Sequence, residues 1–355
     1  MTAEIRRAQI VGTGLIGGSI AMALKSLGWH VTGRDKVPEN ASRALSLGAI
    51  DIIGSDLAAE FTFVAVPAGS TEEEVRRALD ETSGFVTDTG SVKASITSAI
   101  SNPRFIPGHP MAGSEQDGVN GSDPQIFVGA VWVLTPSSGT EDNGLRELQA
   151  LLGSIGSDVV TMGAERHDAL VAIVSHVPHL TAAAMMCMAD DRANDDSPLL
   201  RLAAGGFRDM TRIAAGNPRI WLDICQENRL AIISALDELS KRLGEMREIV
   251  AGDDVESLNA LLSQARRARN NLPARYVRPQ DLIEVRVSIP DKKGQIAKIT
   301  MLAADCDVNV VDIEVTHSVE GSQGILVLVV SRTESQRFLT ALAGLTYHAT
   351  IRELA

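Results

Sequence analysis

Cysteine, aromatic residues and basic runs are all scarce in this chain of 355 residues. Its three cysteines, Cys187, Cys225 and Cys306, lie far apart and form no CxxC pair. This excludes a disulfide framework and a cysteine-built metal site, and it favours a reducing, cytoplasmic location. A formal net charge of −12, without a long run of Lys or Arg, argues against nucleic acid or an anionic membrane as a partner. An anionic substrate would therefore be held by a few locally placed arginines.

Long hydrophobic runs are also rare, and the clearest one is Val171–Ala189. It is long enough for a transmembrane helix, but Ser175, Pro178 and two histidines within it favour a buried core helix. The N-terminus shows no signal-peptide pattern and leads within a few residues into a predicted strand, 8–11. The chain is long enough for two or three domains.

A glycine-rich loop follows that strand and carries the most specific motif. Gly12, Gly14 and Gly17 form GxGxxG between the strand and an Ala-rich helical segment. In this context Gly12 makes the tight turn, Gly14 lets a pyrophosphate approach the backbone, and Gly17 lets the helix pack on the strand. The phosphates would lie on the helix N-terminus at Leu15 and Ile16.

The second predicted strand, 30–33, ends in Arg34-Asp35, about 20 residues beyond the loop, where a ribose-binding carboxylate is expected. Asp35 would accept hydrogen bonds from both ribose hydroxyls and repel a 2′-phosphate, which favours NAD. Arg34 offers that phosphate a cation, so NADP stays an alternative. Asp35 as a cap of the next helix is the structural alternative.

Strand–helix alternation continues and defines a Rossmann-type dinucleotide-binding domain over residues 1–162. Two further buried strands end at Val66-Pro67 and at Asp88, which belong to the predicted cofactor site. Ser91 follows Asp88 at the carboxyl end of the sheet, where open α/β sheets bind ligands. A helix N-cap is the alternative explanation for a serine at this position.

His109 stands between Gly108 and Pro110, after a short predicted strand at 104–107. A histidine flanked by Gly and Pro is expected in a turn, with its ring pointing into a cleft. Ser114 follows in the same polar segment. His109 is therefore a candidate for acid–base chemistry rather than a core residue.

Residues 163–272 change to helices with a 3.6-residue period and predict an all-α domain. Asp168, Ser175 and His179 fall within roughly 20° of one line along a helix, so a polar stripe would follow an apolar rod. Pro178 cannot donate to the helix ladder, and a kink beside His179 is expected.

The histidines of this segment, His167, His176 and His179, also suggest metal ligands, but a single carboxylate and irregular spacing match no common zinc pattern. Arg208 and Arg212 lie four residues apart in a glycine-flanked polar stretch. On one helical face they would form a pair of guanidinium donors. A surface network through the intervening aspartate is the alternative, which the flanking glycines argue against.

The stretch 273–281 contains two prolines and predicts a linker. The remainder, 282–355, shows the element order βαββαβ of a ferredoxin-like module. It contains no cluster of histidines or cysteines and no nucleophile arrangement, which indicates a regulatory role.

Five motifs in this order, GTGLIGGS, DTGSVK, GHPMAGSE, HDALVAIVSHVPH and GGFRDMTRIA, with NPRIWLDI after the last, resemble the prephenate/arogenate dehydrogenases of tyrosine biosynthesis. The resemblance covers roughly residues 8–270, and the combination of motifs is highly specific. The C-terminal module resembles an ACT domain, although its loop at Asp291–Gly294 lacks the usual proline.

The resemblance implies NAD-dependent oxidative decarboxylation of prephenate to 4-hydroxyphenylpyruvate, with no metal required. His109, as a neutral imidazole, would accept a hydrogen bond or a proton from the substrate hydroxyl, and Ser91 would orient it or bridge it to the nicotinamide. Arg212 would bind a carboxylate, and Asp168 would hold a histidine or arginine in place. The substrate-side residues implied in full are Ser114, Asp168, Ser175, His179, Arg208 and Arg212.

Two other substrates, arogenate and 4-amino-4-deoxyprephenate, fit the same fold, and a non-catalytic sensor of NAD and an amino acid is a third possibility. A sensor would not need His109 and Ser91 together. The apolar helix is more hydrophobic than a small domain can bury, so a homodimer through the helical domain is expected. Feedback by tyrosine at the ACT module is implied, with Gly294, Asn309 and Asp312 as candidate contacts.

Overall fold

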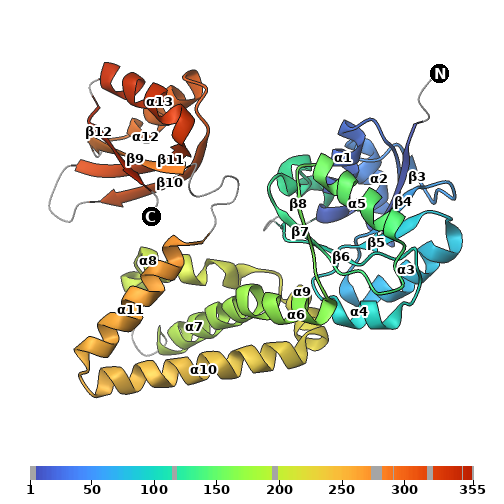
Figure 1. Ribbon diagram of the computed structural model, residues 1–355, viewed down its shortest axis with the longest axis horizontal. Coiled ribbons are helices and arrows are strands. Elements are labelled where there is room, and N and C mark those ends of the chain that lie inside the picture. Colours follow the sequence, from blue (N-terminus) through green and yellow to red (C-terminus); the bar gives the residue numbers. More distant parts are fainter. Residues whose placement is uncertain are drawn as a thin grey trace. The chain divides into compact units, whose positions relative to one another are not determined.

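The computed structural model describes residues 5–113, 118–193, 199–272, 282–290, 292–317, 323–345 and 347–353. By its internal contacts the chain divides into two compact units, Met1–Leu243 and Gly244–Ala355 (Figure 1). Two sequence-based predictions, the substrate contact at Ser114 and the linker at 273–281, lie outside the described residues.

A five-stranded parallel sheet forms the centre of the first unit. Its strands are β1 (Arg7–Val11), β2 (His30–Arg34), β3 (Ile52–Ile53), β4 (Phe61–Val64) and β5 (Phe85–Asp88), in the order β3-β2-β1-β4-β5. The chain reverses the direction of strand addition between β1 and β4, which is the topological switch point of a Rossmann-type sheet. This confirms the predicted dinucleotide-binding fold and places its ligand site outside the carboxyl ends of the strands.

Helices connect these strands and cover the sheet: α1 (Leu15–Ser26), α2 (Pro38–Ser46), α3 (Ala68–Glu81) and α4 (Ala94–Ala99). α1 buries Ile20 and Leu24 in the same apolar cluster as Phe61, Phe63 and Trp132. Small residues at the start of α1 let it lie close to the sheet, so the glycine loop is held rigidly at the edge.

A second, three-stranded sheet follows with strand order β6-β7-β8. The strands of this sheet and the helices between them are β6 (Gly108–Pro110), η1 (Val119–Gly121), η2 (Pro124–Phe127), β7 (Val131–Leu134), α5 (Asp142–Ser154) and β8 (Asp158–Thr161). The predicted strand at 104–107 is reduced to one bridge, between Phe105 and Val86 on β5, and the strand begins later, at Gly108.

The turn expected at His109 is wrong, because His109 lies in β6 opposite Val133 of the antiparallel strand β7. The backbone bonds from Thr135 N to the Pro107 oxygen and from Met111 N to the Val131 oxygen show that alternate residues of this segment pair with β7. Pro110 falls between them, so its missing N–H removes no bond of this ladder.

The helical part begins with one nearly continuous rod and continues with shorter helices. Its elements are α6 (Ala164–Val171), η3 (Ala172–His176), α7 (Val177–Ala193), η4 (Leu199–Leu202), α8 (Gly205–Thr211), η5 (Arg212–Ala215), α9 (Pro218–Glu227), α10 (Arg229–Ala251) and α11 (Val255–Asn270). The division between the two units falls inside α10. An all-α domain after the Rossmann domain is confirmed by this order of elements.

The break expected at Pro178 takes the form of a π-helical turn, η3, directly before it. Pro178 has no N–H to donate to Val174, and a wider turn accommodates the missing bond. Single π turns are rare and are found mostly at functional sites. Among the described residues, Ala164–Ala193 is the one helical run long and apolar enough to cross a membrane. Its buried residues His167 and Asp168 instead contact the Rossmann domain.

The second unit contains a four-stranded antiparallel sheet with the order β10-β11-β9-β12. Its elements are β9 (Leu282–Pro290), α12 (Gln295–Asp305), β10 (Val310–His317), β11 (Gln323–Ser331), α13 (Arg332–Gly344) and β12 (Ala349–Glu353). The predicted order βαββαβ is present. Alternate residues of β9 and β11, such as Val285 and Leu328, pack against Phe338 of α13 in its core.

The candidate effector residues lie at two places in this unit. Gly294 begins α12 with a left-handed φ of 85°, which favours glycine. The backbone N–H of Asn309 donates to Glu334, and the Asp312 carboxylate accepts from the N–H of Ile313.

Candidate active site

The glycine loop is open at the N-terminus of α1. Gly12 has a φ of 90°, and a Cβ there would lie 2.3 Å from the oxygen of Ala65; a Cβ on Gly17 would lie 1.8 Å from the Gly12 oxygen. Only glycine fits at these two positions. A Cβ on Gly14 would meet no heavy atom within 4 Å, and Gly14 precedes α1 without a side-chain cap. The free N–H groups of α1 therefore suit a phosphate.

The two charged residues at the end of β2, Arg34 and Asp35, point in different directions. Asp35 accepts hydrogen bonds from the backbone N–H groups of Thr13 (2.8 Å) and Val37 (2.9 Å), so it braces the glycine loop and the turn into α2. The Arg34 guanidinium lies 2.6 Å from the Glu74 carboxylate on α3. The other predicted cofactor contacts flank the loop: Leu15 and Ile16 form the first turn of α1, and Val66 and Pro67 join β4 to α3.

A buried ion pair underlies the end of β5. Asp88 and Lys93 are both fully buried, and the Lys93 ammonium donates to the Asp88 carboxylate and to the oxygen of Gly108 (2.8 Å). Asp88 also accepts from the N–H groups of Gly90 (2.8 Å) and Gly108 (3.2 Å). The pair therefore fixes the DTGSVK turn against β6, and Asp88 is more enclosed than a cofactor contact at the sheet edge was expected to be. Sequence analysis missed Lys93, since a single lysine in a turn normally indicates an exposed residue.

Three side chains form a hydrogen-bonded relay between β6 and α6. Nδ1 of His109 lies 2.9 Å from Nε2 of His167, and Nδ1 of His167 lies 2.7 Å from a carboxylate oxygen of Asp168. Because a carboxylate only accepts, Nδ1 of His167 carries a hydrogen, and Nε2 of neutral His167 accepts from Nδ1 of His109. Neutral His109 therefore keeps an unprotonated Nε2 for a substrate.

The surroundings of His109 keep it neutral. Burial, and secondarily the charge of Lys93, hold the pKa of the His109 imidazole well below its ordinary value of 6.5. The Asp168 carboxylate is held in turn by the backbone N–H groups of Lys93 and Ala94, both at 2.8 Å. Asp168 thereby caps the N-terminus of α4. This is the role considered for Ser91, which is half-buried and lies three residues before the helix begins.

Asn228 connects the junction of α9 and α10 to this relay. Its amide donates to the backbone oxygen of Asp168 (2.9 Å) and to Nδ1 of His176 (3.1 Å), which leaves the hydrogen of His176 on Nε2. Burial lowers the pKa of His176 from 6.5 to about 4. His179 stacks on Trp221 of α9, with ring centroids 3.5 Å apart. Sequence analysis used the motif that contains Trp221 but did not select this residue, nor Asn228.

The remaining predicted substrate residues are more exposed. Ser175 is half-buried within the π turn. Arg208 is exposed on α8 and donates to the oxygen of Ala203, while Arg212 is exposed at the first position of η5. α8 ends at Thr211, so the two arginines do not share one continuous α-helix, although they belong to adjoining turns. Within the described ranges, no group of three His, Cys, Asp or Glu residues is arranged to hold a metal ion.

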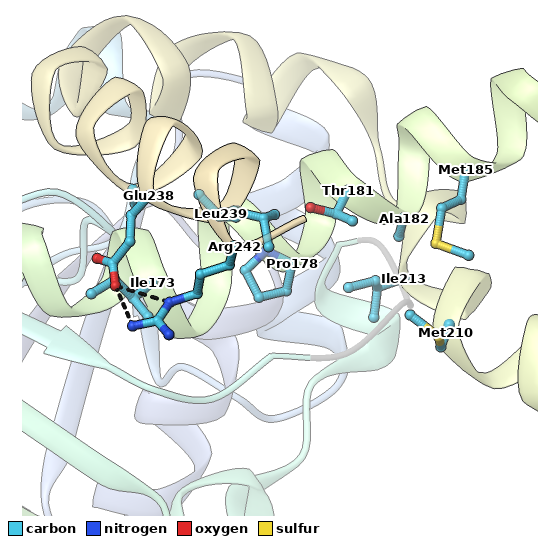
Figure 2. A pocket seen from close by; sticks show the side chains of 12 residues that line it. Ile173, Pro178, Thr181, Ala182, Met185, Met210, Ile213, Glu238, Leu239 and Arg242 are labelled. Atoms are coloured by element: carbon cyan, nitrogen blue, oxygen red, sulfur yellow. Dashed lines mark hydrogen bonds and ion pairs between the residues drawn. The ribbon is translucent and has the colours of Figure 1, made fainter. Parts of the chain in front are cut away.

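An apolar pocket of about 410 Å³ lies on the helical part of the first unit. Figure 2 shows Pro178 beside Leu239 of α10, with the Glu238–Arg242 ion pair at one end of the pocket and Met185 and Met210 at the other. This pocket is not near the relay, since its lining contains none of the relay residues.

An open glycine loop on a Rossmann domain, together with a buried histidine that an all-α domain holds, is typical of a dinucleotide-dependent oxidoreductase. Models of the prephenate dehydrogenase family match residues 20–161, as its nucleotide-binding domain, and 163–264, as its dimerization domain. The chain belongs to the prephenate dehydrogenase family, and is thus an NAD-dependent oxidoreductase.

Individual relatives agree with this assignment. Prephenate dehydrogenase of Bacillus subtilis (strain 168) is 33% identical over 333 residues, which cover 89% of this chain and 90% of that protein. The crystal structure of prephenate dehydrogenase from A. aeolicus in complex with hydroxyphenyl propionate and NAD+ aligns with a TM-score of 0.71 at 30% identity, over 76% of this chain and 99% of that one. Synechocystis arogenate dehydrogenase aligns with a TM-score of 0.66 at 28% identity, over 74% and 99% of the two chains.

Proposed function

We propose that the protein catalyses the NAD-dependent oxidative decarboxylation of prephenate to 4-hydroxyphenylpyruvate in tyrosine biosynthesis. The observation that carries the proposal is the relay from His109 through His167 to Asp168, which fixes a neutral imidazole with a free Nε2. A group of this kind is unprotonated at neutral pH and can accept the proton of a hydroxyl.

The residues present fit the dinucleotide. The open space at Gly14 and the uncapped N-terminus of α1 suit the pyrophosphate, and Asp35 beside Thr13 suits the ribose hydroxyls. When bound, the nicotinamide supplies the acceptor for the hydride that leaves the carbon bearing the ring hydroxyl.

The chain's own residues hold and move the proton. His109 takes the hydroxyl proton at Nε2, and its Nδ1–H then donates more strongly to His167, whose own N–H donates to the Asp168 carboxylate. The positive charge that develops on His109 is stabilised through this relay, because a hydrogen bond in which one partner is ionised is about twice as strong as one between neutral groups. Loss of CO2 from the ring completes the reaction and forms an aromatic product.

The substrate is held from the helical side. Arg212, with Arg208 on the adjoining turn, provides guanidinium groups for the substrate carboxylates, and His179 stacked on Trp221 provides a flat wall. Ser175 lies four residues before His179, and Ser91 is a further hydroxyl donor in the Rossmann domain. Ser114 is a candidate from the sequence alone. These substrate-binding roles are inferred from the family resemblance.

Steady-state turnover tests the proposal. Mixing the protein with NAD and prephenate should produce NADH, and His109→Asn should abolish turnover without weakening NAD binding. His30→Asn is the matched control, since His30 lies at the start of β2 near Asp51 and away from the relay. Full activity of His109→Asn would show that another group is the base.

Arogenate is the second candidate substrate, because Synechocystis arogenate dehydrogenase has a similar fold over three quarters of this chain. The two substrates differ in the side chain, where arogenate carries an amine in place of a keto group. Comparing kcat/KM for prephenate and arogenate separates them. A ratio above about tenfold in favour of arogenate would reassign the substrate.

A homodimer through the helical domain is part of the proposal. The apolar pocket beside α7 and α10, and the exposed side chains of Ile173 and Val174 next to it, provide a surface that a second copy would cover. The matched family domain is described as a dimerization domain. Light scattering of the full chain should give twice the monomer mass, and Ile173→Glu should shift it toward the monomer.

The C-terminal unit is proposed to be an ACT regulatory domain that binds tyrosine. Its βαββαβ order and four-stranded antiparallel sheet support this, with Gly294, Asn309 and Asp312 as candidate contacts. An unchanged rate across a tyrosine titration would remove tyrosine as the effector.

A cytoplasmic location is proposed because the three cysteines are free thiols.

A further inference from the structure

The guanidinium of Arg34 is held away from the place where the adenosine ribose of the cofactor is expected. The backbone oxygen of Arg34 accepts from the N–H of Gly12 (2.8 Å), so this residue starts beside the loop. Its guanidinium, however, lies 2.6 Å from Glu74 and 3.9 Å from Glu81, and its side chain is only 15% exposed. The backbone of Arg34 therefore lies beside the glycine loop, but its charge is directed toward the carboxylates of α3.

Glu74 determines that direction. It is the sixth residue after the start of α3 at Ala68, which places it about 9 Å along the helix from the end nearest the ligand edge. The Nε and Nη2 atoms of Arg34 and the Oε2 atom of Glu74 are buried and make no hydrogen bond with the described residues. The ion pair with Glu74 is the shorter of the two charged contacts of the guanidinium. Glu81 is farther from it and is engaged by Arg77 at 2.7 Å.

The charged group that is fixed at the edge is a carboxylate. Asp35 is fixed there by Thr13 and Val37 and would accept a ribose hydroxyl but repel a phosphate. Lys36 is exposed next to Asp35 and is the other nearby cation in the sequence. With Arg34 paired to Glu74, the charge that is fixed in place near the expected ribose is the Asp35 carboxylate, which disfavours a dianion.

We propose that Glu74 is a specificity-determining residue: it holds Arg34 away from the 2′ position of the adenosine ribose and thereby makes the site selective for NAD over NADP. The inference rests on the proposed function, because it requires that the glycine loop binds the dinucleotide. Releasing Arg34 should let its guanidinium form a charge-assisted pair with a 2′-phosphate, which Arg can bind bidentately.

Calorimetric titration of the full chain with NAD and with NADP, without substrate, tests the proposal. Glu74→Gln keeps the size of the side chain and removes its charge, and it should lower the Kd for NADP by about tenfold or more while the Kd for NAD stays within about twofold. The double variant Arg34→Ala with Glu74→Gln should return the Kd for NADP to the wild-type value. Glu73→Gln is the matched control, because it removes the same charge from an exposed neighbour on α3.

Three results would overturn the proposal: an unchanged preference in Glu74→Gln, a gain for NADP that survives loss of Arg34, or an equal gain in Glu73→Gln. If Glu74→Gln fails to fold by circular dichroism, Glu74→Ala provides the same comparison. Failure of the proposed function is seen separately, as absence of turnover with any cyclohexadienyl substrate. Wild-type protein that binds NADP as tightly as NAD would refute the inference and leave that function intact.

Discussion

Asp168→Asn tests the relay most directly, because the change keeps the shape of the side chain and removes its charge. One carboxylate oxygen of Asp168 accepts from Lys93 N and His167 Nδ1, and the other accepts from Ala94 N. An amide can keep its oxygen on the first side and make both of those bonds. Its NH2 group then faces the N–H of Ala94, and that bond is lost.

The expected losses of unfolding free energy and of transition-state stabilisation are of similar size. One backbone donor left without its partner costs about 1–3 kcal/mol of unfolding free energy. In turnover, the neutral amide stabilises the charge that develops on His109 less well than the carboxylate does. A hydrogen bond to a charged group contributes about 1.5–3 kcal/mol and a neutral one about 0.5–1.5 kcal/mol, so the difference of about 1–1.5 kcal/mol lowers kcat by roughly 5–13-fold. KM for prephenate should change less, because Asp168 does not face the substrate directly.

Steady-state kinetics and urea unfolding measure both effects on the same preparation. Glu165→Gln is the control, since Glu165 is exposed one turn earlier on α6 and loses the same charge. A kcat within about threefold of the wild-type value in Asp168→Asn would show that the carboxylate does not support the base. The relay would then be a structural feature without a role in proton transfer.

Three further changes test other parts of the site. Lys93→Met leaves the Asp88 carboxylate buried without its cation, and should lower the unfolding free energy by about 3–5 kcal/mol in urea titrations, while a Lys93→Met, Asp88→Asn double variant should recover part of that loss. His176 has a pKa of about 4 in the folded state against 6.5 when unfolded, so the unfolded state binds more protons between these values and stability falls as the pH drops from about 6.5 to 4. Between pH 7 and pH 4.5, His176→Gln should lose less unfolding free energy than the wild-type protein, by up to about 3 kcal/mol. An equal loss in both proteins would assign the pH effect to other groups. Trp221→Leu removes the ring stacked on His179 and should raise KM for prephenate by about tenfold while KM for NAD is unchanged, and parallel increases in both constants would contradict a substrate-side role.

Sequence patterns predicted the architecture well because they reflect backbone constraints. Gly12 and Gly17 are read directly from the motif, since each would clash if it carried a Cβ. Pro178 predicts a break in the helical hydrogen bonds, because proline has no backbone N–H to donate. The turn at His109 was wrong because pairing with β7 is a long-range interaction that neighbouring Gly and Pro do not reveal.

The relay could not be predicted in full for a related reason. His109 and His167 are 58 residues apart, and neither local periodicity nor spacing shows that β6 and α6 meet. His167 looked instead like one of several irregularly spaced histidines. Lys93 was missed because its burial depends on Asp88, and only the fold shows that the two side chains share an enclosed space.

The same geometry explains why the base and its support belong to different domains. His109 lies on a Rossmann strand, whereas His167 and Asp168 lie on the first helix of the all-α domain. Asp168 also caps α4 of the Rossmann domain, so the contact that joins the two domains is the contact that sets the tautomer of His109. A base with its free Nε2 correctly placed therefore exists only while α6 is docked. Variants that loosen this docking should lose kcat together with stability, even where they touch neither the substrate nor the cofactor.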